Sequence, residues 1–391
     1  MRKDIEQLYH ISEKPKRQII GLMSGTSLDG LDIALCEITG SGTNTEVTLK
    51  HFTTVDYPDE VKSKIRTVFA KPQVSLEYLT LLNPWIGKYH GQLINQALKA
   101  WQVNPKEIDA IASHGQTIYH CPKHQHAFED FANATLQIGD GDHLAVETGI
   151  VTLSDFRQKH IAAGGEGAPL AQFGDYFCFS SNTEHRVLLN LGGIANITYL
   201  PKAGSFNEIL CSDLGPGNTI MDAYMQKYFD QAFDSDGAIS SKGSVNQALL
   251  FKLLDNDFVE LGLPKSTGPE VFNLDYLQAA QQESNTAHLK HEDVMATLCE
   301  LSALLIAEQL NHLSENIELN VYASGGGVHN PLLMQRIQEL SSDKVLISSS
   351  DEISLDPDAK EAILFAVLAN ECLVGTSTEF GVSMGKLSFP N

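Results

Sequence analysis

The sequence has few of the features that mark secreted or membrane proteins. Its six cysteines are scattered, and no two of them form a C-x-x-C pair, so we expect reduced thiols. The residues after Met1 form no apolar leader segment, and no uninterrupted apolar run approaches membrane-spanning length. We therefore expect a soluble, cytoplasmic protein without a membrane partner.

Positive charge is also scarce. The chain has 27 Lys and Arg against 49 Asp and Glu, which gives a formal net charge of -22 at pH 7. A field of this sign repels nucleic acid and anionic membrane surfaces, so neither is expected as a partner. It does not exclude ATP, because local NH dipoles and a magnesium ion neutralise phosphates at short range.

Two common nucleotide-binding signatures are missing. The sequence has no G-x-x-x-x-G-K-[ST] loop and no G-x-G-x-x-G that opens a helix after a strand. No lysine lies in either of the two glycine-rich turns described next. If these turns bind phosphate, its charge must be neutralised by main-chain NH groups and a metal ion.

The sequence does contain one design used twice. Residues 19–35 and 187–200 each read as an apolar strand, a glycine-rich polar turn and a second apolar strand. Such a turn can present NH groups and hydroxyls to phosphate oxygens, because glycine lets a ligand approach the main chain closely. A tight hairpin with internally satisfied polar groups is the alternative for one copy, whereas two copies predict a nucleotide clamped between similar lobes. The candidate nucleotide-binding residues are Ser24, Gly25, Thr26, Ser27, Leu28, Asp29, Gly30, Leu31 and Asp32 in the first hairpin, and Gly192, Gly193 and Asn196 in the second.

A chain of 391 residues exceeds what one hydrophobic core usually serves, so two domains are expected. We place the N-terminal lobe at residues 1–160 and the C-terminal lobe at 161–391, with the C-terminal helix able to pack back on the first lobe. The glycine-rich stretch 164–169 is the predicted hinge. Apolar periodicity predicts helices within 57–101, broken or started at Pro84, and at 220–228, 294–313 and 359–373.

Asp213 is the candidate general base. It ends a short strand before the rigid turn Gly215-Pro216-Gly217-Asn218, and it precedes a helix whose N-terminal dipole favours an anion. Helix capping is the competing explanation for an aspartate at this position. Further along, Gly325-Gly326-Gly327 either presents a flat surface to a purine or forms a simple strand-to-helix turn.

Other charged side chains have a functional and a structural reading. Arg157, at a strand end, can bind a carboxylate or sugar hydroxyls, or it can form a weak surface ion pair. Glu361 can accept hydrogen bonds from hydroxyls or simply favour the start of the last helix. Asp29 and Asp32 can order a magnesium ion or its waters.

A group of histidines with one cysteine invites a metal hypothesis. The spacing of His114, His120, Cys121, His124 and His126 fits none of the common zinc patterns. A metal-dependent hydrolase built on them is one alternative, and it predicts stoichiometric zinc in the purified protein. We expect His114 to orient a loop instead.

Several segments also form a recognisable set. They are GLMSGTSLDG (21–30), SHGQT (113–117), DFR (155–157), GGEGAPL (164–170), NLGGIAN (190–196), DLGPGN (213–218), KSTG (265–268) and GGG (325–327). In order and spacing they closely resemble the anhydro-N-acetylmuramic acid kinase family over nearly the whole chain.

The resemblance implies an α/β protein with the two-lobed actin-like ATPase fold of acetate and sugar kinases, built on duplicated ribonuclease H-like cores. It implies a kinase that uses ATP and Mg²⁺. Such an enzyme hydrolyses the 1,6-anhydro bridge of anhydro-N-acetylmuramic acid and phosphorylates O6, giving N-acetylmuramic acid 6-phosphate and ADP in cell-wall recycling. It also implies a homodimer.

The same resemblance implies residue roles. Asp213 deprotonates the water that attacks C1, and residues 25–32 form the principal ATP-phosphate loop. Asp29 is the implied magnesium ligand, directly or through water. The implied substrate-binding residues are Arg157, Glu361, His114 and Gln116.

Two departures from the family pattern bear on substrate affinity. Pro269 stands before Glu270 where the family often has arginine, and residues 171–175 replace its usual Val-Pro-Ala-Phe-His segment. Neither touches the implied base or phosphate loop. The alternative of a different class is an actin-like ATP-binding sensor or scaffold without catalysis.

Overall fold

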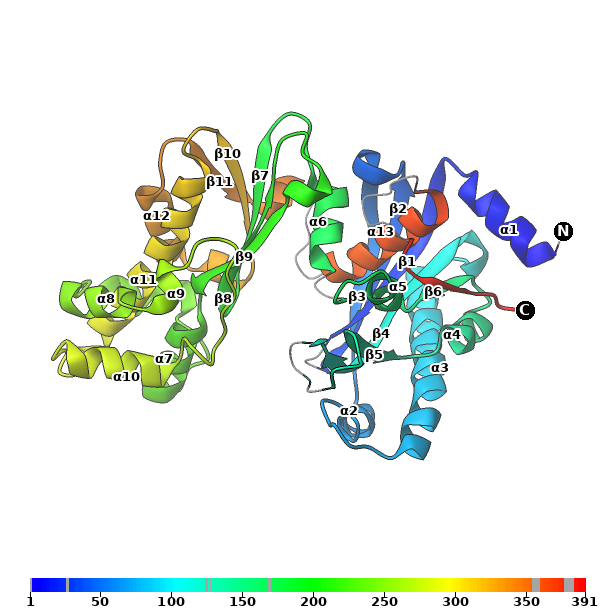
Figure 1. Cartoon of the computed structure of the whole chain (residues 1–391), viewed down its shortest axis with the longest axis horizontal. Coiled ribbons are helices and arrows are strands. Elements are labelled where there is room, and N and C mark those ends of the chain that lie inside the picture. Colours follow the sequence, from blue (N-terminus) through cyan, green and yellow to red (C-terminus); the bar gives the residue numbers. More distant parts are fainter. Residues whose placement is uncertain are drawn as a thin grey trace. The chain divides into compact units, whose positions relative to one another are not determined.

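The chain divides into two compact units, each described by itself. The computed structural model describes residues 2–25, 28–123, 126, 128–167, 170–353, 359–375 and 383–391. Unit 1 comprises Met1–Cys178 and Asp358–Asn391, and unit 2 comprises Phe179–Pro357 (Figure 1).

Unit 1 is built on one mixed sheet. Its strands are β1 (Lys16–Ser24), β2 (Gly30–Thr39), β3 (Glu46–Asp56), β4 (Ala110–Cys121), β5 (Ala134–Ile138), β6 (Thr152–Ser154) and β12 (Lys386–Ser388). The order is β12-β6-β4-β1-β2-β3, with β5 paired to β4. Strands β1, β4 and β6 are parallel, whereas β2 and β12 run antiparallel to their neighbours. The helices are α1 (Lys3–Ser12), α2 (Asp59–Arg66), α3 (Leu76–Trp101), α4 (Gly141–Thr148), α5 (Phe156–Ala162), α6 (Ala171–Phe179) and α13 (Lys360–Val374).

Unit 2 has a five-stranded sheet in the order β11-β10-β7-β8-β9. Its strands are β7 (His185–Leu191), β8 (Ile194–Leu200), β9 (Leu210–Pro216), β10 (Leu319–Ser324) and β11 (Val345–Ser349). Its helices are α7 (Thr219–Phe229), α8 (Gln247–Leu254), α9 (Asp257–Glu260), α10 (Leu274–Glu283), α11 (His291–Leu313) and α12 (Pro331–Leu340). Helix α11 is buried along most of its length and supplies much of the core of this unit.

The two sheets share one topology. In unit 1 the run β3-β2-β1-β4-β6 has its second strand antiparallel to the other four, and in unit 2 the run β9-β8-β7-β10-β11 repeats this arrangement. This is the ribonuclease H-like core, present twice. The chain therefore has the α/β actin-like ATPase fold that the resemblance implied.

The end of the chain belongs to unit 1 because α13 packs on its sheet. A Cβ placed on Gly21 of β1 would lie 1.8 Å from the Ala362 carbonyl oxygen, so strand and helix backbones are in direct contact. Helix α6 joins the same unit through an ion pair of 2.8 Å between Asp175 and Lys360. The division thus falls between Cys178 and Phe179, later than the expected boundary after residue 160, and α13 contacts β1 of unit 1.

The predicted break at Pro84 is wrong. Helix α3 begins after Ser75, whose hydroxyl accepts from the Tyr78 NH, and it runs through Pro84 without interruption. Its inner face, which includes Ile86 and Ile94, is buried in the core of unit 1. Burial of that face outweighs the one backbone hydrogen bond that proline removes.

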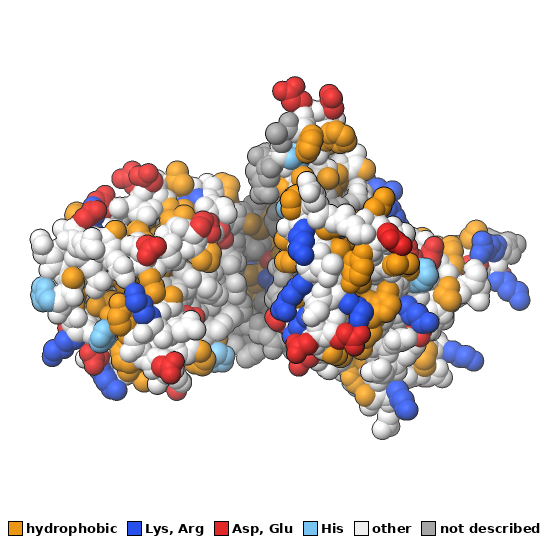
Figure 2. All heavy atoms as spheres, turned by 90° about the horizontal axis from the view of Figure 1, so that it is seen from below, with side chains coloured by type: hydrophobic (Ala, Val, Ile, Leu, Met, Phe, Trp, Pro, Cys, Tyr) orange, Lys and Arg blue, Asp and Glu red, His pale blue; other side chains and the backbone are white. Residues whose placement is uncertain are grey.

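None of the helices in the described ranges is both long enough and apolar enough to cross a membrane. On the face shown in Figure 2, acidic, basic and apolar side chains are interspersed over each unit.

Candidate functional site

The turn of the first hairpin is held from inside unit 1. Ser24 is 1% exposed, and its hydroxyl donates to Gln116 Oε1 at 2.6 Å and lies 2.9 Å from the Tyr57 hydroxyl. Gln116 Nε2 donates to the Gly25 carbonyl at 3.0 Å. The polar groups of Ser24 and Gln116 therefore shape the turn. The sequence analysis predicted that Ser24 contacts the nucleotide and that Gln116 contacts the sugar, and both contacts stay predictions.

The apolar residues of the turn face inward. Leu28 and Leu31 are 3% and 1% exposed and belong to the core of unit 1, so only their main chain can reach a nucleotide. A Cβ on Gly30 would lie 2.5 Å from the Val55 carbonyl oxygen, which shows that β3 packs directly against this glycine.

Two carboxylates flank the same turn. Asp29 is exposed, whereas Asp32 is half-buried and accepts a hydrogen bond from Thr54 Oγ1 at 2.6 Å. Both are oxygen donors of the kind that magnesium prefers. Thr26 and Ser27, which were predicted in this loop, lie outside the described residues.

Arg157 is anchored at two points in unit 1. Its Nε donates to His114 Nε2 at 3.0 Å, and its Nη1 donates to the Gly167 carbonyl at 2.6 Å. Burial, and then the Arg157 charge, lower the pKa of His114 to about 3, so the imidazole is neutral and accepts at Nε2. The ring packs against Phe365 of α13 with a centroid distance of 4.8 Å. His114 therefore holds Arg157 in place from a buried position.

Glu361, in the first turn of α13, belongs to the same charged group. Desolvation raises the pKa of its carboxyl, the Asp32 charge raises it further, and the Arg157 charge acts in the opposite direction. Burial in turn lowers the pKa of Arg157, against the attraction of Glu361. The structure thus brings three predicted residues, Asp32, Arg157 and Glu361, within electrostatic reach of one another in unit 1.

A polar cavity of about 320 Å³ adjoins His114. It is lined by residues of β4, β5, β6 and β12, by the start of α4 and by Asn83 of α3. Ser113 Oγ borders this cavity, is buried, and makes no hydrogen bond with any described residue. The sequence did not predict the cavity, because its walls come from six separate elements.

The glycines of the second hairpin lie between β7 and β8. The Gly193 carbonyl accepts from the Gly217 NH at 2.8 Å, and the Gly192 carbonyl accepts from the Asn218 NH at 2.9 Å. A Cβ on Gly192 or Gly193 would meet no atom closer than 3.4 Å or 3.7 Å, and neither residue has a positive φ. Neither the packing nor the backbone conformation requires glycine at these two positions. The missing side chains therefore allow a ligand to approach the main chain closely.

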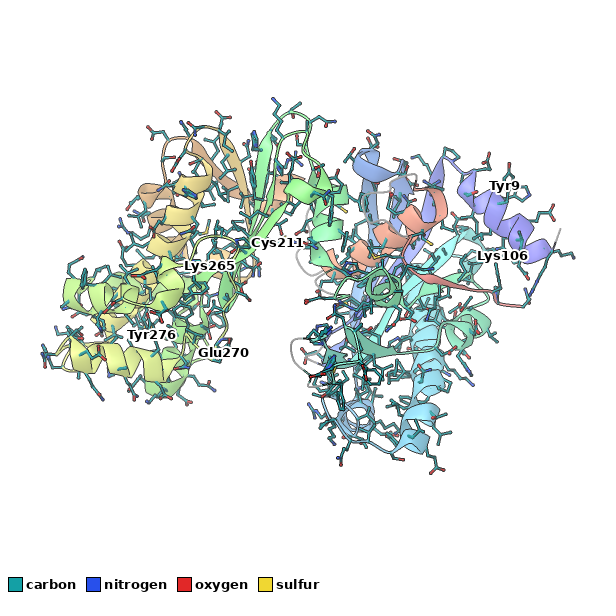
Figure 3. The ribbon with its side chains drawn as sticks, in the orientation of Figure 1. Tyr9, Lys106, Cys211, Lys265, Glu270 and Tyr276 are labelled. Carbon is teal, nitrogen blue, oxygen red and sulfur yellow. The ribbon has the colours of Figure 1, made fainter. Side chains whose placement is uncertain are left out.

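Asp213 lies near the end of β9, opposite Asn196 of β8. Its carboxylate Oδ2 accepts from the Thr267 NH at 2.9 Å and from the Ser266 hydroxyl at 3.0 Å. Its NH donates to the Lys265 carbonyl at 2.9 Å, and Figure 3 labels Lys265 in this loop of unit 2. The carboxylate therefore has one oxygen fixed by a neighbouring loop.

The helix-cap explanation for Asp213 is wrong. Helix α7 begins at Thr219, and Asn218 occupies its N-cap position. The Asp213 side chain is engaged with the loop at 266–267 instead. The Asp213 carboxylate is therefore held by this loop and does not cap α7.

The triple glycine combines two packing roles with one open position. A Cβ on Gly325 would lie 2.6 Å from Asn190 Oδ1, and one on Gly327 would lie 2.7 Å from Leu191 Cβ. Both glycines are required where the turn packs against the end of β7. At Gly326, by contrast, a Cβ would meet nothing within 4 Å.

Gly326 and Gly327 line a cavity of about 250 Å³ within unit 2. Phe233 and His329 contribute to its walls, as does Asp222 of α7. Desolvation raises the pKa of Asp222 to about 6. Sequence reasoning missed Asp222, because an acid in the first turn of a helix has an ordinary structural explanation.

The histidine cluster does not assemble into a metal centre in the part of the chain that is described. Across those residues, no three His, Cys, Asp or Glu side chains are arranged to hold a metal ion. His114 binds Arg157, and the ring of His126 lies 3.2 Å from the Ala132 carbonyl. His124 lies outside the described residues.

Comparison with known sequences points to one family. The family profile described as anhydro-N-acetylmuramic acid kinase matches residues 17–385. Proteins of that name from Pseudoalteromonas atlantica and Pseudoalteromonas translucida are each 58% identical, over 401 and 399 residues, and the alignments cover 100% of this chain and of each relative. Another, from Caldanaerobacter subterraneus subsp. tengcongensis, is 36% identical over 397 residues, covering 98% of this chain and 100% of the relative. The chain belongs to the anhydro-N-acetylmuramic acid kinase family.

Proposed function

We propose that this chain converts anhydro-N-acetylmuramic acid, ATP and water into N-acetylmuramic acid 6-phosphate and ADP, in the cytoplasmic recycling of cell-wall sugars. The observation that carries the proposal is the Asp213 carboxylate, of which Oδ2 accepts two hydrogen bonds from one loop. It occurs in a chain whose family is named for a kinase acting on this sugar.

In the proposed reaction, Asp213 Oδ1 takes a proton from a water molecule. The water oxygen forms a bond to C1 of the sugar as the bond from C1 to O6 breaks. O6 then forms a bond to the γ-phosphorus, the bond from that phosphorus to the β,γ-bridging oxygen breaks, and ADP leaves. The proton on Asp213 passes to solvent, so the sugar gains one water and one phosphoryl group.

We propose that main-chain NH groups of residues 25–32 and of Gly192 and Gly193 bind the phosphates, with Asn196 beside the second turn. Support comes from the second hairpin, where neither packing nor backbone conformation requires Gly192 or Gly193 to be glycine. The purine is proposed to lie over Gly326, which faces open space beside the cavity of unit 2.

Asp29 is the proposed magnesium ligand, directly or through water. It is exposed beside the turn, and Asp32 offers a second carboxylate nearby. Magnesium is commonly held by one or two carboxylates together with waters and substrate phosphates, so this donor set fits it. When bound, the ion supplies positive charge beside the phosphate oxygens.

Arg157 and Glu361 are the proposed sugar contacts in unit 1. A guanidinium has five N–H donors, and Arg157 uses two of them in its hydrogen bonds to described residues, His114 and Gly167. His114 and Gln116 are proposed to act through Arg157 and the first turn.

Residues 171–175, which depart from the family pattern, open α6, and Asp175 pairs with Lys360 next to Glu361. The departure therefore lies beside a proposed sugar contact, and we propose that it changes the affinity for the sugar.

Incubation with ATP, magnesium and anhydro-N-acetylmuramic acid tests the proposal. We expect mass spectrometry to detect a product heavier than the sugar by one water and one phosphoryl group, together with stoichiometric ADP. ATP binding without sugar-dependent ADP release would contradict the proposal and favour the scaffold alternative. We also propose a homodimer, on the family resemblance, and light scattering after gel filtration measures that mass directly.

A further inference from the structure

The KSTG segment, residues 265–268, donates the two hydrogen bonds that the Asp213 carboxylate accepts. In the structure this loop is docked firmly on β9. Lys265 is 8% exposed, and its Nζ donates to the Phe258 carbonyl at 3.0 Å and lies 4.4 Å from the centre of the Phe258 ring. The lysine thus anchors the loop internally, and the next two residues are carried to a fixed position.

A second anchor ties the loop backbone to the strand. Ser212, which is 6% exposed, accepts through its hydroxyl from the Lys265 NH at 2.9 Å. The Asp213 NH donates to the Lys265 carbonyl at 2.9 Å. These contacts hold the main chain of the loop but do not touch the Asp213 carboxylate.

The carboxylate receives its two hydrogen bonds on one oxygen. The Ser266 hydroxyl and the Thr267 NH both donate to Oδ2, at 3.0 Å and 2.9 Å. Among the described residues, none donates a hydrogen bond to Oδ1. One oxygen is therefore immobilised while the other remains available to a water molecule.

We propose that Ser266 is a positioning residue, which fixes the plane of the Asp213 carboxylate. The proposal rests on the proposed function, in which Asp213 is the base. A hydrogen bond to a charged group is stronger than one between neutral groups. Ser266 is exposed, so its hydroxyl serves no buried packing that would explain the contact.

Two charged side chains of the same loop have contacts elsewhere. Lys265 directs its ammonium to the carbonyls of Phe258 and Val259, and Glu270 brings its carboxylate against Gly268 of the same loop. Figure 3 labels both Lys265 and Glu270 in unit 2. Neither makes the direct contact with Asp213 that Ser266 makes, so Ser266 is the side chain to change.

The test compares Ser266→Ala with two matched variants. Ser266→Thr keeps a hydroxyl, and Ser212→Ala weakens the docking of the loop without removing a donor from the carboxylate. For Ser266→Ala we expect kcat to fall about tenfold, with little change in KM for ATP. Ser266→Thr is expected to retain most of the activity, and Ser212→Ala to lower kcat less than Ser266→Ala does.

A readout independent of turnover separates this inference from the proposed function. Crystal structures of the unaltered chain, of Ser266→Ala and of Ser212→Ala record the orientation of the Asp213 carboxylate without turnover. We expect the plane of the carboxylate to rotate in Ser266→Ala and to stay in place in Ser212→Ala. An unmoved carboxylate in Ser266→Ala, or an equal rotation in Ser212→Ala, would overturn the role of Ser266. A rotated carboxylate in a chain that does not phosphorylate the anhydrosugar would support the contact and reject the proposed function.

Discussion

At the scale of single residues, Asp213 is the most direct test of the chemistry. An amide at this position can still accept the loop hydrogen bonds on its oxygen, but it cannot take a proton from water. We expect Asp213→Asn to lower kcat by about 10²–10⁴-fold, the usual contribution of a general base. Calorimetry should find ATP affinity nearly unchanged in the same variant. Full activity would remove Asp213 from the mechanism.

Two buried histidines make stability depend on pH. Burial lowers the pKa of His90 from 6.5 to about 4, and burial with the Arg157 charge lowers that of His114 to about 3. Below pH 6.5 the two imidazoles bind protons in the unfolded chain but stay neutral in the folded chain. The free energy of unfolding therefore decreases as pH falls. The expected slope is about 1.4 kcal/mol per pH unit for each histidine.

Urea denaturation of the unaltered chain and of His90→Gln at pH 7 and pH 5 measures this effect. Glutamine does not titrate in this range, so the loss of stability between the two pH values should be smaller in the variant. His312→Gln is the control, because His312 is exposed. Equal losses in all three proteins would contradict the assignment of neutral, buried imidazoles.

At the scale of elements, the contact between β1 and α13 decides where the end of the chain belongs. Gly21→Ala would place a Cβ 1.8 Å from the Ala362 carbonyl oxygen, so the helix must move. We expect a loss of about 1–3 kcal/mol in the free energy of unfolding, as for other overpacked sites. Gly262→Ala is the matched control, because its Cβ would meet nothing within 4 Å. Equal stability of the two variants would contradict the direct backbone contact.

Sequence reasoning predicted elements better than it predicted what their side chains do. Both hairpins and the buried helix near the C-terminus were predicted from apolar runs and glycine-rich turns, which are local signals. Whether Ser24 faces a phosphate or Gln116, and what His114 contacts, depends on β4 packing beside β1. Local sequence does not encode that choice, since a polar residue at a turn can satisfy either partner.

At the scale of the whole molecule, the proposed machinery is divided between the units. Asp29 and Arg157 belong to unit 1, whereas Asp213 and Gly326 belong to unit 2. A reaction that uses both units requires their arrangement to respond to the substrates. We expect the X-ray scattering profile of Asp213→Asn to change when ATP, magnesium and the anhydrosugar are added together. A profile unchanged by all three would contradict this expectation.

The sequence by itself determined that this chain has two hairpins of one design and the ordered motifs of one kinase family, because these are properties of neighbouring residues. It also determined the wide spacing of the cysteines and the excess of acidic residues, because these follow from composition and order alone. Tertiary structure alone decided that residues 358–391 return to unit 1, that His114 serves Arg157, and that Ser266 and Thr267 hold Asp213 from more than fifty positions away. The physical reason is that hydrogen bonds and burial join groups by distance in space, and distance in space is set only when the sheets have formed.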